Sequence, residues 1–165
     1  MKRAIAGLLA VTALAAAAGH AEAQGGTLPI SVEVRLDAGL PVGDFKDGAK
    51  AGLGWGVTGA FDVAPNFALC AGYSSFDFDL KSSTATLRDD GFDVGGRVIL
   101  GTGGGVMTTY AQFGALFHNG DTGFEAGLGA EYPVSPAVAL TPLARYRKVG
   151  DTQYVGIGVG ISLRP

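Results

Sequence analysis

The chain has 165 residues, with 12 Lys and Arg against 15 Asp and Glu, so its formal net charge is −3. This mild acidity, without any cluster of basic residues, argues against nucleic acid as a partner. Glycine is unusually abundant, because 28 glycines exceed twice the average usage of about 7% and follow no collagen triplet.

The first residues have the layout of a secretory signal peptide. A basic start, an alanine-rich apolar run over residues 4–18 and an A-x-A cleavage motif ending at Ala23 follow one another. We therefore predict a signal peptide at residues 1–23 and a single mature domain at residues 24–165, exported from the cytoplasm. An amphipathic first helix is the alternative interpretation.

Beyond the signal peptide, apolar and polar residues alternate almost everywhere. In the stretch PISVEVRLDAGL, Val32, Val34 and Leu36 alternate with the charged Glu33 and Arg35. A period of two is typical of a strand with one apolar and one polar face, and no window has the apolar stripe of a helix. Eight strands are predicted, near residues 29–40, 52–63, 67–77, 91–100, 106–117, 123–133, 137–148 and 153–164.

One motif in the second of these strands points elsewhere. The stretch GLGWGVTGA holds Gly54, Gly56 and Gly59 in the G-x-G-x-x-G spacing of a dinucleotide-binding loop. Such a loop needs a buried strand before it and a helix after it. Here the charged GDFKDGAK precedes the glycines, and Pro65 lies where the helix would run. We therefore assign the glycines to a strand and predict no cofactor.

The connections and the aromatic residues favour a barrel in a membrane. Long, charged connections near LPVGDFKDGAK and DFDLKSSTATLRDD contrast with short ones near VAPN, GTGGG and PVSP, as in outer-membrane barrels. Aromatic residues of the apolar face fall near strand ends, which suits the two interfaces of a bilayer. At the long-loop rim they are Trp55, Phe92, Phe117, Phe124 and Tyr146, and at the opposite rim Phe61, Phe67 and Tyr132. The predicted fold is all-β, an eight-stranded antiparallel up-and-down transmembrane β-barrel.

The polar face combines large charged residues with glycines, which fits the narrow interior of a small barrel. An unpaired buried charge costs on the order of several kcal/mol, so we expect arginines and carboxylates to pair across the lumen. The predicted lumen charge network consists of Glu33, Arg35, Asp37, Asp93, Arg97, Glu125, Glu131, Arg145 and Arg147. We interpret it as a packed polar plug, and a gated ion path is the alternative.

Four segments carry a resemblance to a known family. They are LPVGDF with its following glycines, MTTYAQFGALF, FEAGLGAEYPVSPAVAL and ARYRKVGDTQYVGIGVGISL, which together cover nearly all of residues 28–163. The chain resembles the small bacterial outer-membrane barrels that include the membrane domain of outer membrane protein A and the opacity-type surface proteins. The resemblance implies a monomer in the outer membrane, with outer-membrane lipid, lipopolysaccharide and the barrel-assembly machinery as partners. Its role would be structural or surface interaction, with the long loops contacting a surface ligand.

Other functions are open from the sequence alone: a small porin-like pore, a lipid A-modifying enzyme, or a soluble periplasmic barrel with its apolar face inward. One deacylase type of similar size uses a surface histidine with a serine two residues later. Here Gly120 stands at that spacing from His118, so the nucleophile is missing. We interpret His118 as a polar loop residue at the end of a strand, and we predict no catalytic residue.

No metal site is predicted either. The lone Cys70 can form neither an intramolecular disulfide nor a cysteine-based metal site. Carboxylates suit Ca²⁺, but those near the third connection lack the spacing of a calcium loop. We interpret these residues, Asp77, Asp79, Asp89 and Asp90, as a solvated acidic loop.

Overall fold

The computed structural model describes residues 30–103 and 106–164. The predicted signal peptide, residues 1–23, lies outside this part of the chain, as does the start of the predicted mature domain. Eight strands make up most of the described residues. They are β1 (Ile30–Pro41), β2 (Gly52–Ala64), β3 (Phe67–Asp79), β4 (Thr86–Gly103), β5 (Met107–His118), β6 (Asp121–Ser135), β7 (Val138–Val149) and β8 (Thr152–Leu163).

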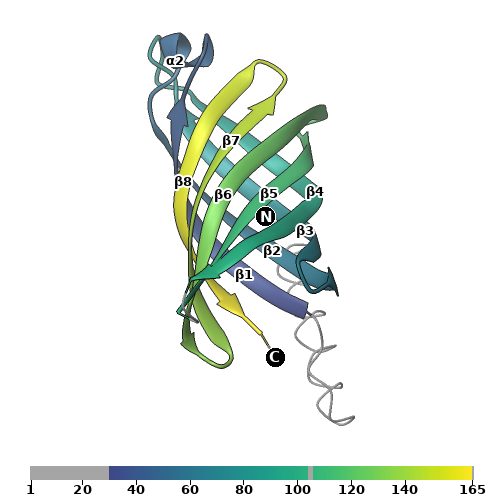
Figure 1. Ribbon diagram of the computed structural model, residues 1–165. Coiled ribbons are helices and arrows are strands. Elements are labelled where there is room, and N and C mark those ends of the chain that lie inside the picture. The colour runs from purple at the N-terminus through teal and green to yellow at the C-terminus, as the bar shows by residue number, and fades with distance from the viewer. Residues whose placement is uncertain (1–29, 104–105, 165) are drawn as a thin grey trace, which may run out of the picture.

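The strands form one closed barrel in sequence order (Figure 1). Each strand pairs antiparallel with the next, and β1 pairs with β8, so that Arg35 lies opposite Gly56 on one side and Gly160 on the other. Closure gives every strand two partners and leaves no edge with unpaired backbone groups. The predicted eight-stranded antiparallel up-and-down barrel is confirmed.

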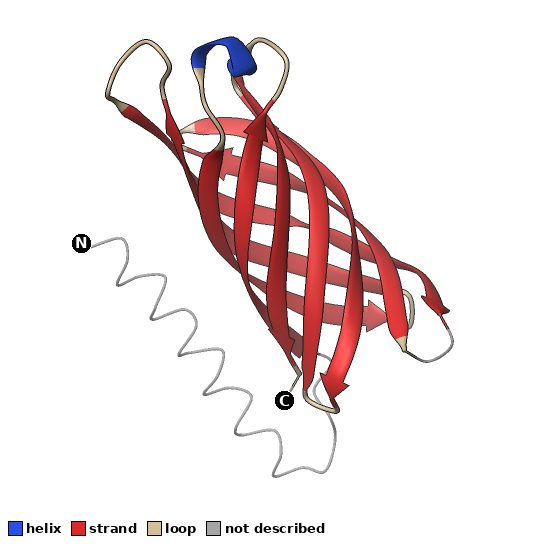
Figure 2. Ribbon diagram, turned by 90° about the vertical axis from the view of Figure 1, so that its left-hand side faces the viewer, coloured by secondary structure: helices blue, strands red, loops and turns tan. Residues whose placement is uncertain are grey.

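The two ends of the barrel differ (Figure 2). One end carries residues 42–51, with the short helix α2 (Phe45–Gly48), and the β3–β4 hairpin, whereas the other carries the turns at residues 65–66 and 136–137. We call the end with α2 the outer end and the opposite one the inner end. The described chain begins and finishes at the inner end (Figure 1). No helix among the described residues is long and apolar enough to span a bilayer.

The β3–β4 hairpin is longer than the sequence predicted. Residues 77–90 were expected to form a loop, but the ladder continues outward to the pair Asp79 and Thr86. Arg88 donates hydrogen bonds of 2.6 and 3.0 Å to the two carboxylate oxygens of Asp77 across this extension. The strand was difficult to recognise from the sequence because its two large hydrophobic residues that turn inward, Phe78 and Leu87, lie among charged residues.

The barrel is apolar outside and polar inside. Leu36 is 70% exposed, while its neighbours Arg35 and Asp37 are 2% and 4% exposed. The alternation therefore continues through the whole strand, with the charged side chains directed into the lumen. In a protein surrounded by water the leucines would be the buried set, so this inverted arrangement is that of a barrel whose outer surface meets lipid.

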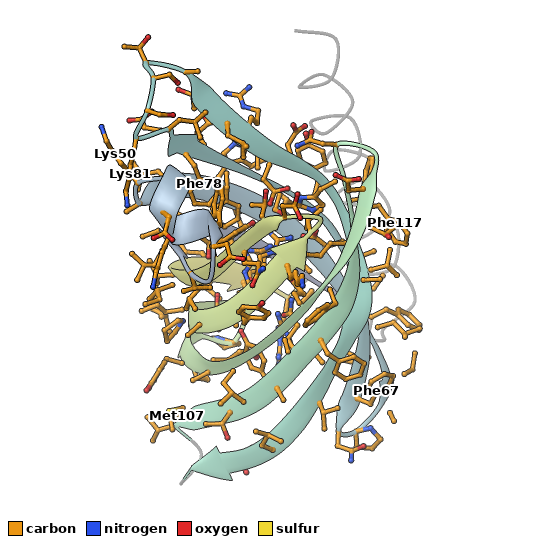
Figure 3. The ribbon with its side chains drawn as sticks, turned by 90° about the horizontal axis from the view of Figure 1, so that it is seen from above. Lys50, Phe67, Phe78, Lys81, Met107 and Phe117 are labelled. Carbon is orange, nitrogen blue, oxygen red and sulfur yellow. The ribbon has the colours of Figure 1, made fainter. Side chains whose placement is uncertain are left out.

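Aromatic side chains cluster on the outside near the outer end. Tyr73, which the sequence analysis did not single out, lies between Trp55 and Phe92, with ring centroids 5.8 and 5.4 Å away. Phe124 and Tyr146 form a second pair at 5.9 Å. Phe117 is exposed on β5 and is directed away from the barrel (Figure 3). All five aromatic residues predicted for this rim thus lie on the outer surface.

The inner end carries fewer aromatic rings. Phe61 and Tyr132 are exposed near the turns that follow β2 and β6. Phe67 lies outside the barrel (Figure 3), and its ring covers Gly96, where an added Cβ would come within 2.8 Å of it. The three aromatic residues predicted for this rim therefore also lie on the outer surface.

Candidate functional site: the lumen of the barrel

Arg35 is surrounded by carboxylates at the middle of β1. Its Nε lies 3.3 Å from Asp37, and its terminal nitrogens lie 3.6 Å from Glu33 and 3.7 Å from Asp93. Its Nη1 also donates to the hydroxyl of Thr58. Because Glu33, Arg35 and Asp37 are alternate residues of one strand, the strand itself brings two carboxylates to the guanidinium.

Arg97 of β4 forms the second group, nearer the inner end. Its Nη1 donates to Glu131 at 2.9 Å and its Nη2 to Glu33 at 3.1 Å. The guanidinium lies over the ring of Tyr110, 4.1 Å from its centroid, a distance at which the cation is attracted to the face of the ring. A cavity of about 20 Å³ beside Arg97 and Glu131 reaches Arg164, and it has room for one water molecule.

Arg145 and Arg147 of β7 form the third group. Arg145 donates to Asp37 at 3.0 Å and lies 3.4 Å from Glu125. Arg147 donates to Asp93 at 2.8 Å, and its Nε lies 3.2 Å from the same Glu125 oxygen. The structure therefore places every residue of the predicted network inside the barrel, in contact with a residue of opposite charge.

Glycines make room for these large side chains. A Cβ added at Gly158 would lie 2.2 Å from an oxygen of Asp37, and one at Gly56 would lie 2.8 Å from Arg35. A Cβ at Gly129 would lie 2.4 Å from the ring of Tyr110. Such distances are shorter than any ordinary contact, so these glycines are required by the side chains opposite them.

The lumen also holds an aromatic cluster that the sequence analysis missed. Phe76, Phe78 and Tyr154 are fully buried near the outer end, and the two phenylalanine rings lie 4.8 and 4.9 Å from the tyrosine ring. Phe45 of α2 packs edge-on against Phe78, with ring centroids 5.2 Å apart. Figure 3 shows Phe78 beside α2. We call these four residues the outer plug. The signal was present in the stretch SSFDFD, where the phenylalanines share the phase of the buried Ser74.

The outer plug requires two glycines of β2, Gly52 and Gly54, and the second of these belongs to the G-x-G-x-x-G motif. A Cβ at Gly54 would lie 2.5 Å from the ring of Phe76, and one at Gly52 would lie 2.6 Å from that of Phe78. Of the glycines that resemble a nucleotide-binding loop, Gly54 therefore faces an aromatic ring across the β2–β3 pair, and Gly56 faces the guanidinium of Arg35. Their role in this structure is steric.

The interpretation of His118 as a polar loop residue is wrong, because His118 is the last residue of β5 and its side chain lies in the lumen. It is fully buried, and its Nδ1 lies 2.9 Å from Asp89 while its Nε2 lies 2.7 Å from Asp93. Asp89 is likewise buried rather than part of a solvated acidic loop. The error has one cause: β4 begins at Thr86, so Asp89 falls in phase with Asp93 and turns inward.

Two further contacts join this pair of carboxylates to their surroundings. Asp89 accepts a hydrogen bond of 2.7 Å from the hydroxyl of Tyr154, and Asp93 accepts one of 3.0 Å from Ser74. The charged lumen and the outer plug are thus one connected structure. Among the described residues, no group of His, Cys, Asp and Glu side chains is arranged to hold a metal ion.

Comparisons with known proteins agree with this architecture. No family model and no curated protein matches the chain. Among solved structures, it is similar to Neisserial surface protein A (13% identity, 85% of this chain and 99% of that one, TM-score 0.63). It is also similar to the N-terminal β-barrel domain of OprF from Pseudomonas aeruginosa (11% identity, 84% of this chain and 98% of that one, TM-score 0.58). A third similar structure is that of Ail, the attachment invasion locus protein of Yersinia pestis (14% identity, 82% of this chain and 96% of that one, TM-score 0.53). The chain has the fold of the small eight-stranded outer-membrane barrels, as the sequence resemblance predicted.

Proposed function

We propose that this protein is a non-conducting barrel of the bacterial outer membrane that acts through its outer surface. The observation that carries the proposal is the closure of the outer mouth, where three buried aromatic side chains fill the lumen and α2 covers them. A channel needs a continuous wet path. Here the apolar outer plug lies on the outer side of a layer of paired charges, and neither leaves a continuous path for ions.

The outer end has the properties of a contact surface. The backbone N–H of Lys50 donates to Asp79 at 2.9 Å, and that of Lys81 donates to Gly48 at 2.8 Å, so the first loop and the β3–β4 hairpin are fastened together. The side chain of Lys81 also donates to the carbonyl of Lys46. We call Lys46, Lys50 and Lys81 the lysine group. All three are exposed, and Figure 3 shows Lys50 and Lys81 near α2.

The proposed ligand is an anionic saccharide, because exposed ammonium groups on two adjoining segments attract sulfate and phosphate groups. Ail, whose fold this chain shares, has been solved with the heparin analogue sucrose octasulfate. Exposed Asp44 and Asp47 beside the lysine group would restrict binding to ligands that reach the lysines directly. The same chemistry fits the phosphorylated sugars of lipopolysaccharide, which would surround the barrel in its membrane.

An enzymatic role has less support. A lipid-modifying enzyme must present its base to a substrate at the bilayer surface, whereas His118 is fully buried inside the lumen and has carboxylates at both ring nitrogens. The proposal therefore includes no catalytic activity. We further propose that the signal peptide directs export, that the barrel-assembly machinery inserts the protein, and that it is a monomer in outer-membrane lipid.

Two measurements test the proposal. Purified full-length protein in planar bilayers is expected to give no steady single-channel steps, and steady steps would instead support the porin-like alternative. Lipid vesicles carrying the protein are expected to bind a fluorescent heparin oligosaccharide, with most of that binding lost in the Lys46→Ala, Lys50→Ala, Lys81→Ala triple variant.

A matched control uses Lys148→Ala, which removes an exposed lysine near the outer end of β7 and should leave binding unchanged. Vesicles with and without lipopolysaccharide distinguish the two sources of anionic sugar, because bound lipopolysaccharide would compete with the oligosaccharide. Equal binding by wild type and the triple variant would show that the lysine group is not the contact surface.

A further inference from the structure

The surroundings of His118 determine how many hydrogens its imidazole ring carries. Its Nδ1 lies 2.9 Å from Asp89 and its Nε2 lies 2.7 Å from Asp93. An ionised carboxylate only accepts hydrogen bonds, whereas a neutral imidazole has one N–H donor and one acceptor nitrogen. With both carboxylates ionised, both contacts can be hydrogen bonds only if each ring nitrogen carries a hydrogen. The geometry is therefore that of an imidazolium held between two carboxylates.

We propose that the Asp89–His118–Asp93 bridge is a proton-binding site that locks the outer half of the lumen. With its second proton, His118 joins two neighbouring carboxylates of β4 to β5. Without that proton, one carboxylate faces a nitrogen lone pair at hydrogen-bond distance, and the contact becomes repulsive. This inference is independent of the proposed surface function.

The charged groups that face the site come from several strands. Arg147 of β7 lies 3.3 Å from Nε2 of His118 and opposes its charge, but the same guanidinium donates to Asp93. Arg35 of β1 lies 3.7 Å from Asp93, and Tyr154 of β8 donates to Asp89. Exposed Asp121 of β6 is the residue paired with His118 in the ladder.

The remaining strands contribute no further charge at the site. Ser74 of β3 reaches it as a neutral donor to Asp93. Glu125 of β6 is connected to it only through Arg147. Arg147 and Arg35 oppose the extra proton, but each is itself paired with Asp93, whereas Asp89 and Asp93 contact the two ring nitrogens directly. The local field therefore favours the extra proton.

The charge balance of the lumen supports the same protonation state. Six carboxylates and four arginines are buried among the described residues. Arg164, which is half exposed, bridges Glu131 at the inner mouth and supplies a fifth positive charge. A protonated His118 supplies the sixth, and the lumen is then neutral. Buried charges are tolerated when they are paired, so the neutral histidine would leave one carboxylate in excess.

The proton also affects the outer plug. Tyr154 donates a hydrogen bond to Asp89 and packs against Phe76 and Phe78, so a movement of Asp89 is transmitted to the plug. The folded barrel holds the proton more tightly than the unfolded chain does. Stabilisation by the bridge is therefore complete below about pH 6.5, where a free histidine is also protonated, and it is lost as the pH rises further.

The direct test is the protonation state of the ring. The chain has two histidines, and His20 lies in the predicted signal peptide. His118 is therefore the only histidine of the predicted mature domain, and ¹⁵N-labelled imidazole spectra of the folded, membrane-inserted protein report on it alone. We expect both ring nitrogens to carry hydrogen at about pH 7. A single protonated nitrogen, with the other accepting from Arg147, would overturn the proposal.

A stability series provides a second test. The thermal unfolding midpoint of wild type should fall by about 3 °C or more between about pH 6 and about pH 8, and His118→Gln should remove that part of the fall. Asp89→Asn is the informative variant, because an amide can donate to a neutral imidazole and still accept from Tyr154. It should fold and show a flat profile over this range.

The matched control is Asp90→Asn, which changes the adjacent carboxylate of β4. Asp90 accepts from Tyr73 on the outer surface and makes no contact with the bridge, so this variant should retain the wild-type pH profile. If His118→Gln and wild type lost stability in parallel as the pH rose, the bridge would not be the proton-binding site.

Discussion

At the scale of single residues, the buried ions of the lumen form chains rather than isolated pairs. Asp93 touches Arg147, His118 and Arg35, while Glu125 lies between Arg145 and Arg147. Each carboxylate in such a chain keeps a partner when a neighbour moves slightly. Loss of one arginine, however, leaves two carboxylates short of a positive charge in a place that water does not easily reach.

Arg147→Met should therefore destabilise the folded barrel by about 3 to 5 kcal/mol, the usual effect of removing one partner of a buried ion pair. Methionine fills most of the volume of the arginine side chain, so the loss of stability measures the removed charge rather than lost packing. Urea unfolding in lipid vesicles measures it. Arg88→Met is the control, because Arg88 and Asp77 form an exposed pair, and exposed pairs contribute little to stability. Equal unfolding midpoints for the two variants would contradict the argument.

The direction of these side chains could be predicted from the sequence, but their partners could not. Alternation alone places Glu33, Arg35 and Asp37 on one face of β1. The pairing of Arg145 with Asp37, in contrast, joins residues 108 positions apart, and depends on the closure of β1 on β8. His118 was misjudged for a related reason, since its partners become visible only once β4 is known to begin at Thr86.

At the scale of the strands, small and large residues are matched across neighbours. Gly52 and Gly54 of β2 accept Phe78 and Phe76 of β3, whose rings would overlap with any Cβ there. The sequence predicted such matching in general, and it predicted most strand ends to within a few residues. It could not show that aromatic rings fill the outer lumen, because the aspartates between them suggested a solvated loop. The four-residue helix α2 is also too short to leave a periodic signal.

This matching predicts a compensating pair of substitutions. Gly54→Val should destabilise the barrel by about 1 to 3 kcal/mol, as overpacking usually does, because its Cβ would meet the ring of Phe76. Phe76→Ala removes that ring, so Gly54→Val should cost less in its presence, and the two changes should be less than additive. Gly101→Val is the control, since nothing lies within 4 Å of a Cβ at that position. Additive effects of Gly54→Val and Phe76→Ala in a denaturant series would show that the two residues do not compete for space.

At the scale of the whole molecule, the two faces of one closed sheet meet opposite surroundings. The inside is too narrow to hold more than its own side chains, so its charges must pair with one another. The outside carries aliphatic residues between two sets of aromatic rings, and nothing in the described chain covers it. The alternation of the sequence could not decide which face is outside, because a soluble barrel alternates in the same way. The aromatic positions and the glycines made that decision possible.

The stability cost of a charged residue on the outer face distinguishes a lipid environment from an aqueous one. Leu36 lies at the middle of β1 and is 70% exposed, while Leu40 lies four residues closer to the outer end. In a bilayer, Leu36→Arg should cost about 2 to 4 kcal/mol of unfolding free energy and Leu40→Arg about 1 kcal/mol or less, because the penalty falls towards the interface. On a surface exposed to water both substitutions would be nearly neutral. Urea unfolding of the two variants in phospholipid vesicles measures the difference, and equal small effects would mean that this face does not lie in lipid.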